Sequence, residues 1–244
     1  MKTATYQERS YRSWVTDRGL VTFEVKVRET DLQIRAEHDL SELADKLVRE
    51  CRRDIESYIA RDRRFLTSLT PLAVEANAPV IVKRMAEDAA QFGVGPMAAV
   101  AGAIADCVGR GLLQHSAHVI VENGGDIFAL TPSPVTFALF AGQKSPFTRG
   151  FRFRVSCAAR GKGICTSSGT VGHSLSFGKA DAAVVVAQSA SYADAAATAL
   201  GNLVRCEDDI ERIVEQERRL QRVDGVVLAL GGRIGIWGDI EVVE

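Results

Sequence analysis

Two segments of the chain share one form, in which a pair of glycines joins two short apolar strands. They are VIVENGGDIFAL at 119–130 and VVLALGGRIGIW at 226–237. A Gly-Gly pair between two such runs predicts a tight β-hairpin. An isolated hairpin is hardly stable in water, so each unit needs further strands or a helix to cover it. This requirement constrains the fold more than any other feature of the sequence.

Each predicted hairpin follows a helix of small residues, and two predicted strands precede each helical region. The helices are MAAVAGAIADCV (97–108) and ADAAATALGNLV (193–204). The strands are VTFEVKV (21–27) and TDLQIRA (30–36) in the first half, and FRFRVSC (151–157) and DAAVVVA (181–187) in the second. The order β-β-α-α-β-β therefore occurs twice along the chain.

We predict an α+β fold built from two such units, at about 20–140 and 150–240 of a single domain that covers residues 1–244. The strands would form an antiparallel sheet with the helices on one face. The alternative is that two short hairpins resemble one another by chance.

The overall composition excludes several classes of protein. Lys and Arg number 30 and Asp and Glu 31, a balance that argues against general nucleic-acid binding. No segment approaches the roughly 20 apolar residues of a membrane span. The 5 cysteines are scattered without a CxxC pair, which favours reduced thiols over disulfides or a zinc site. We therefore expect a cytoplasmic protein.

A segment rich in Gly, Ser and Thr, TSSGTVG at 166–172, is the first candidate for ligand binding. Successive backbone N–H groups in such a segment can surround an anion, and the hydroxyls of Thr166, Ser167 and Ser168 add donors. Gly169 permits close approach of a ligand. The alternative is an ordinary loop between strands. His173 follows the segment and could donate to a phosphate or transfer a proton, or could simply be hydrogen-bonded in the loop.

Asp194 and Thr198 form the second candidate because they are four residues apart on a predicted helix. Residues at this spacing share a helix face. A carboxylate and a hydroxyl side by side are hard oxygen ligands that suit Mg²⁺, which commonly adds waters and substrate phosphates. The alternative is that Asp194 caps its own helix and that Thr198 bonds to a backbone carbonyl.

Two further features have a structural and a functional interpretation. Asn123–Gly124–Gly125–Asp126 is ordinary hairpin-turn chemistry, but Asn123 and Asp126 flank the turn and could reach a ribose or a metal-bound phosphate. Cys165 precedes the TSSG segment, where neighbouring N–H donors could lower its pKa and make it a nucleophile. A small buried residue is the alternative for Cys165.

In their order along the chain, NGGDI (123–127), TSSG (166–169) with the following His173, and ADAAATAL (193–200) resemble the motifs of ApbE-like flavin transferases. The resemblance is closer to an uncharacterised branch of that superfamily and extends from about Val21 to Trp237. It implies a duplicated T-fold-like architecture. It also implies transfer of FMN from FAD to a Ser or Thr of a protein acceptor, with Mg²⁺.

The resemblance assigns a role to each candidate residue. Asp194 and Thr198 match the metal-binding residues of the transferases, and His173 matches an active-site histidine. Asp194 and His173 are therefore the predicted catalytic residues. The predicted flavin-binding residues are Asn123, Gly124, Gly125, Asp126, Thr166, Ser167, Ser168 and Gly169.

Two departures from the transferases concern the ligand contacts. No lysine occurs between Lys83 and Lys144, where the transferases carry one, and SLSFGKAD follows His173 in place of their D-P-x-T-G segment. The leading hypothesis is a Mg²⁺-dependent protein that binds FAD, FMN or another nucleotide phosphate and acts as a transferase. The alternative is a non-catalytic protein that binds a phosphorylated ligand on the same scaffold, which the two departures favour. An enzyme with Cys165 as nucleophile is the third hypothesis.

Overall fold

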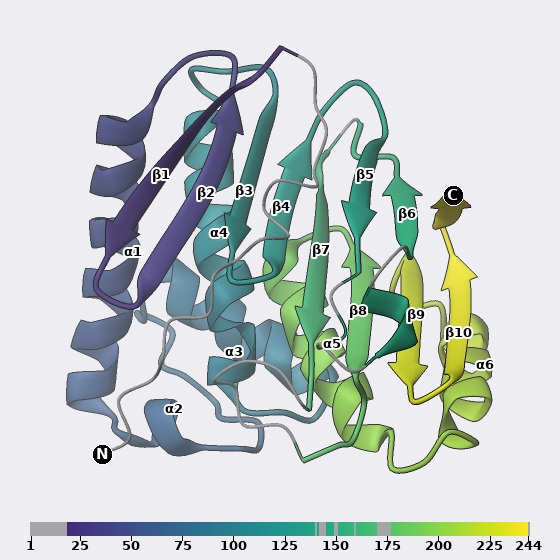
Figure 1. The fold of residues 1–244 in the computed structure, drawn as a ribbon. Helices are drawn as coiled ribbons and strands as arrows, with labels where there is room; N and C mark the ends of the chain where they lie inside the picture. The colour runs from purple at the N-terminus through teal and green to yellow at the C-terminus, as the bar shows by residue number, and fades with distance from the viewer. Residues whose placement is uncertain are drawn as a thin grey trace.

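The computed structural model describes residues 19–139, 141, 145–148, 151–158, 160–169 and 177–243. These residues form three layers, in which a large sheet lies between a layer of helices and a smaller sheet (Figure 1). The helices are α1 (Ser41–Arg61), α2 (Arg64–Thr67), α3 (Val80–Gln91), α4 (Val100–Leu112), α5 (Ala190–Leu203) and α6 (Asp209–Leu220). Two short 3-10 helices span Pro96–Ala99 and Pro146–Thr148.

The large sheet has eight antiparallel strands in the order β1-β2-β3-β4-β7-β8-β9-β10. Its strands are β1 (Val21–Val27), β2 (Thr30–Ala36), β3 (Val119–Asn123), β4 (Asp126–Leu130), β7 (Lys162–Ser167), β8 (Ala182–Ala187), β9 (Gly225–Leu230) and β10 (Arg233–Gly238). Each half of the chain supplies four neighbouring strands, and β4 pairs with β7 where the halves meet. The predicted antiparallel α+β class is confirmed, whereas a T-fold-like duplication stays a prediction.

The three remaining strands form the smaller sheet, in the order β11-β6-β5. They are β5 (Val135–Ala138), β6 (Arg152–Val155) and β11 (Glu241–Val243). The prediction that 151–157 begins the second unit of the large sheet is therefore wrong, because β7 takes that place. The burial patterns explain the difference. β6 is exposed at Arg152, whereas β7 is buried or half-buried along its whole length, as a strand between two layers must be.

Successive residues of the central strands enter two separate cores. Val185 of β8 packs among the helices, whereas its neighbours Val184 and Val186 pack against β5 and β6. This alternation follows from the pleat of a strand, whose side chains point to opposite faces in turn. Helices therefore cover one face of the large sheet, and the smaller sheet covers part of the other.

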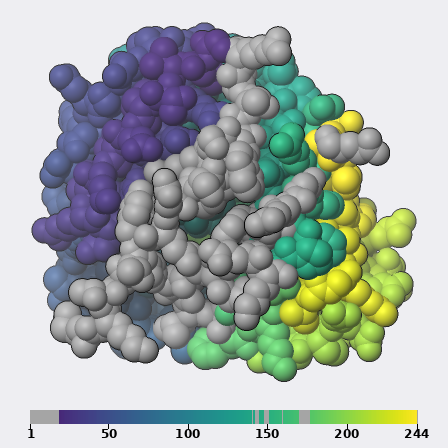
Figure 2. All heavy atoms as spheres, in the orientation of Figure 1, coloured from purple at the N-terminus to yellow at the C-terminus, as the bar shows by residue number. Residues whose placement is uncertain are grey.

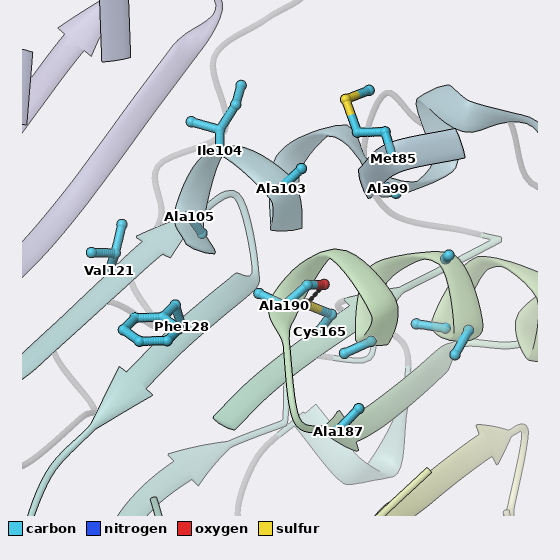
Figure 3. Packing of buried hydrophobic residues seen from close by; sticks show 14 of the residues in the cluster. Met85, Ala99, Ala103, Ile104, Ala105, Val121, Phe128, Cys165, Ala187 and Ala190 are labelled. Atoms are coloured by element: carbon cyan, nitrogen blue, oxygen red, sulfur yellow. Dashed lines mark hydrogen bonds between the residues drawn. The ribbon is translucent and has the colours of Figure 1, made fainter. Parts of the chain in front are cut away.

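The small residues of α4 and α5 allow these helices to approach each other and the sheet closely. A Cβ atom on Gly102 of α4 would lie 2.2 Å from the carbonyl oxygen of Ala190, which begins α5. A Cβ atom on Gly163 of β7 would lie 2.3 Å from the backbone nitrogen of the same alanine. Figure 3 shows this packing, with Ala190 beside Cys165 of β7 and near Ala99 and Ala103.

All five cysteines are free thiols. Across the described residues, no single helix is long and apolar enough to cross a membrane. One pair of helices, Val80–Gln91 with Pro96–Leu112, meets that test jointly but is bent by 103° at its break.

Candidate functional site

Some of the predicted site residues, Asn123–Asp126, Ser167 and Asp194, lie at one end of the large sheet, where the β3–β4 turn and the end of β7 meet α4 and α5. The turn holds Gly124 at φ +69° and Gly125 at φ +106°. Positive φ at both central residues is the geometry of the tight hairpin turn that glycine favours. The side-chain nitrogen Nδ2 of Asn123 donates to the carbonyl oxygen of Ala101 at 3.0 Å. The turn is thereby fixed to the N-terminal end of α4.

Asp194 connects α5 to the same end of α4. Its Oδ2 accepts a hydrogen bond from the backbone N–H of Gly102 at 2.9 Å. The N-cap of α5 is Ser189, whose Oγ accepts from the N–H of Tyr192 at 3.2 Å. The alternative that Asp194 caps its own helix is therefore wrong, because it caps a neighbouring helix instead. N-terminal N–H groups of a helix favour such a negative partner.

Asp126 supplies a second carboxylate on this face of the sheet. It is 9% exposed, and burial raises its pKa to about 7. Hydrogen bonds from the Cys165 thiol and from the backbone N–H of Thr166 lower the pKa of Asp126, whereas the negative charge of Glu122 raises it further. Burial also raises the pKa of Asp194 well above its usual value, and the negative charge of Asp126 raises it further. The site thus holds two carboxylates that oppose each other's ionisation.

Cys165 lies opposite Asp126 in the β4–β7 ladder. Its Sγ is fully buried and donates to the carbonyl oxygen of Ala190 at 3.2 Å, the contact drawn in Figure 3. Burial raises the pKa of this thiol, and the charges of Asp126 and Asp194 raise it further. A nucleophilic Cys165 with a lowered pKa is therefore wrong, since only the thiolate attacks. The cysteine is the small buried residue of the alternative interpretation.

The TSSG segment is arranged differently from the predicted loop. Thr166 and Ser167 belong to β7 and pair with Val184 and Ala183 of β8. The N–H of Gly169 donates to the carbonyl oxygen of Ala180 at 2.9 Å. The described part of the segment is therefore a strand end with paired backbone groups, and the predicted anion-binding run of N–H donors over 166–172 stays a prediction.

Strand alternation also separates the hydroxyls of this segment. Ser167 shares the helix-facing side of the sheet with Asp126 and Cys165, and it is buried. Thr166 lies on the side of Val184, which faces the smaller sheet. Of these two hydroxyl residues, the structure therefore brings only Ser167 to the face of the carboxylates. Ser168 follows the end of β7.

Thr198 lies one turn along α5 from Asp194 and is half-buried. His173 lies outside the described residues. Within the described part of the chain, no three His, Cys, Asp or Glu side chains are grouped so as to hold a metal ion. A metal at this site would therefore need oxygen atoms from hydroxyls, waters or a bound ligand beside the two carboxylates.

The sequence did not identify Asp106 as a site residue, although it makes the same kind of contact as Asp194. Asp106 of α4 is 7% exposed, and its Oδ2 accepts from the backbone N–H of Ser191 in α5 at 3.0 Å. Each of the two helices thus gives a carboxylate to the N-terminal end of the other. The signal in the sequence was a single acidic residue among the small apolar residues of 97–108.

The chain matches a known family of proteins. The family model described as AbpE bacteria matches residues 12–224. A UPF0280 protein of Methanococcus aeolicus is 41% identical over 222 residues, which cover 88% of this chain and 89% of that protein. A UPF0280 protein of Methanocaldococcus jannaschii is 39% identical over 219 residues, covering 88% and 89%. The chain belongs to the AbpE family, as its motifs predicted.

Solved structures of the same fold include flavin transferases. A mutant of the flavin transferase ApbE from Vibrio cholerae superposes with a TM-score of 0.58 at 14% identity, over 90% of this chain and 97% of that one. The ApbE protein from Thermotoga maritima superposes with a TM-score of 0.55 at 12% identity, over 88% of this chain and 96% of that one. At such identities the likeness concerns the fold.

Proposed function

We propose that the protein binds a flavin nucleotide through Mg²⁺ at the end of the large sheet and transfers FMN from FAD to a protein acceptor. The observation that carries the proposal is the pair of carboxylates beside the N-terminal end of α4, the buried Asp126 and the half-buried Asp194. Support for the flavin comes from the family and from the flavin transferases that share the fold.

A divalent cation suits these carboxylates for an electrostatic reason. Burial and mutual repulsion disfavour two negative charges, and a cation between them would favour the ionised forms. Asp194 and Thr198 would hold Mg²⁺, with Asp126 as the second carboxylate. Mg²⁺ prefers oxygen ligands and usually keeps waters and phosphate oxygens in its shell. When bound, it would neutralise charge on the phosphates of FAD.

The hairpin turn offers a place for the rest of the nucleotide. A Cβ atom on Gly125 would meet no other atom within 4 Å, so the space beside the turn is open to a ligand. Asn123 holds the turn against α4, and Ser167 adds a hydroxyl on the same face of the sheet. In the proposed reaction, a hydroxyl of the acceptor protein attacks the phosphorus of the FMN half of FAD, and AMP leaves. His173 would take up the proton of that hydroxyl.

A non-catalytic flavin-binding protein is the second candidate. The absence of lysine between Lys83 and Lys144 favours it, because that residue is a basic ligand contact in the transferases. Binding would then persist while the phosphoanhydride of FAD stays intact.

One experiment separates the two candidates. The protein is incubated with FAD and Mg²⁺, with and without a candidate acceptor, and AMP is measured by chromatography while bound flavin is measured by fluorescence. Release of AMP that is lost in the Asp194→Asn variant supports the transferase. Bound FAD without AMP supports the binding protein. If FAD binds neither with nor without Mg²⁺, both candidates are wrong.

A further inference from the structure

Helices α1 and α4 lie side by side in the helix layer and run in opposite directions (Figure 1). Helix α1 follows β2, and α4 precedes β3, which pairs antiparallel with β2. Ala36 at the end of β2 is the partner of Val119 at the beginning of β3. The N-terminal end of α1 and the C-terminal end of α4 therefore lie at the same end of the sheet.

The register of these two helices places two cysteines opposite each other. A Cβ atom on Gly111 of α4 would lie 2.6 Å from Cδ1 of Leu47 of α1, so the helices are in direct contact at this level. Cys51 is four residues after Leu47, and Cys107 is four residues before Gly111. Residues at this spacing share a helix face. Because the helices are antiparallel, one turn along α1 and one turn back along α4 lead to the same level, where the two thiols meet.

The thiols of Cys51 and Cys107 are hydrogen-bonded to each other. This hydrogen bond lowers the pKa of Cys107, and together with burial it raises the pKa of Cys51. Burial and the negative charges of Asp106, Asp54 and Glu50 oppose the fall at Cys107 but do not cancel it.

The two thiols differ in their access to solvent. Cys107 is half-buried, whereas Cys51 is 4% exposed. Blue atoms of the part of the chain that includes α1 form the left-hand boundary of the molecule in Figure 2, so the pair lies near the surface of the helix layer. Cys107 is therefore the thiol that a small oxidant reaches first and that ionises more readily.

Each of the three other cysteines has a hydrogen-bond partner that is not a thiol. Cys157 and Cys165 are buried, and both donate to backbone carbonyl oxygens. Cys206 is exposed, and its Sγ donates to Oδ2 of Asp209 at 3.5 Å. Cys51 and Cys107 are thus the thiols that the described structure brings together.

We propose that Cys51 and Cys107 form a redox pair, which hydrogen peroxide converts into a disulfide between α1 and α4. The Cys107 thiolate attacks one oxygen of the peroxide, the O–O bond breaks, and the departing hydroxide takes up the proton that the thiol has lost. Sγ of Cys51 then attacks the resulting sulfenic sulfur, and the S–OH group leaves as water with the proton of the second thiol. In total, the two thiols lose two electrons and two protons, and the peroxide is reduced to two waters.

Thermal unfolding tests whether the disulfide fits the native packing. The bond would close a loop of the chain that contains α2 and α3, and such a loop restricts the unfolded state. Oxidised wild-type protein is expected to melt about 5–10 °C above the reduced protein. The Cys107→Ala variant should melt at the same temperature with and without peroxide. A linked protein that melts no higher than the reduced protein contradicts a bond that fits the contact of α1 and α4.

Mapping of the linked peptides tests the pair itself. The folded protein is treated with hydrogen peroxide, its remaining thiols are alkylated, and its tryptic peptides are identified by mass spectrometry. The expected product is an intramolecular link between Cys51 and Cys107 that dithiothreitol removes. Cys206→Ser is the matched control and should keep this link, whereas Cys51→Ala and Cys107→Ala should each abolish it. Absence of the Cys51–Cys107 link from oxidised wild-type protein overturns the proposal.

Discussion

Asp126 is buried and Asp194 is half-buried, and burial raises the pKa of both carboxylates. The sequence predicted that Asp194 and Thr198 share a helix face, because they are four residues apart. The sequence did not predict the hydrogen bond between Asp194 and Gly102, because it joins residues 92 positions apart and depends on how α4 and α5 pack. For the same reason the burial of Cys165, which decides its pKa, could not be predicted from its neighbours in sequence.

The raised pKa of Asp126 predicts that the metal-free protein loses stability as pH rises from 5 to 8. A native pKa of about 7 lies above the unfolded value, so the native state binds an extra proton between the two values. That contribution is present at low pH and is lost as pH rises to about 7. Urea unfolding in EDTA is expected to show a loss of about 1–4 kcal/mol over this range.

Asp126→Asn should reduce this pH dependence, because the asparagine does not titrate, while Asp194, whose pKa is also raised, keeps a part of it. Carboxylates with a lowered pKa, such as Asp209, affect stability only below the pKa that they have in the unfolded chain and therefore act outside this pH range. A wild-type stability that rises between pH 5 and 8 would mean that Asp126 is ionised in the native state.

Gly102→Ala should destabilise the protein by about 1–3 kcal/mol, because the added Cβ would overlap the backbone of Ala190. The atoms it meets are main-chain atoms, which cannot turn aside as a side chain can. The matched control is Gly232→Ala, where a Cβ would meet nothing within 4 Å. Chemical denaturation of both variants checks the prediction, and equal stabilities would show that α4 and α5 are less closely packed than described.

Helices α4 and α5 act as a pair because each supplies a carboxylate to the N-terminal end of the other. Asp194 accepts from Gly102, and Asp106 accepts from Ser191. The helices themselves were predicted from their small residues and from the hairpins that follow them. Strand β7 was missed because its Gly, Ser and Thr residues are typical of loops. Its position between two covering layers outweighs those local preferences.

Asp106 should contribute to stability through its acceptor oxygen more than through its charge. Asp106→Ala leaves the buried N–H of Ser191 without its partner and is expected to cost about 1–3 kcal/mol. Asp106→Asn keeps an acceptor and should cost less than half as much, since the charged form is already disfavoured by burial. Urea unfolding at pH 7 compares the two. If both variants lose the same stability, the helix-capping role of Asp106 is wrong.

At the scale of the whole molecule, one continuous sheet joins the two halves of the chain. The flavin site is proposed at the end of that sheet where β3, β4 and β7 meet α4 and α5. The antiparallel α+β class followed from the repeated order of strands, helices and hairpins. The smaller sheet could not be predicted from that order, because β5, β6 and β11 are short and β11 comes from the far end of the chain.

Calorimetric titration of FAD in the presence and absence of Mg²⁺ tests the proposed metal and flavin site most directly. Wild-type protein is expected to bind FAD at least about tenfold more tightly with Mg²⁺, a difference of about 1.4 kcal/mol. Asp194→Asn should abolish that difference, while the exposed Asp45→Asn variant should keep it. FAD binding that is equally tight with and without Mg²⁺, or that is unaffected by Asp194→Asn, would contradict a metal-dependent flavin site at this end of the sheet.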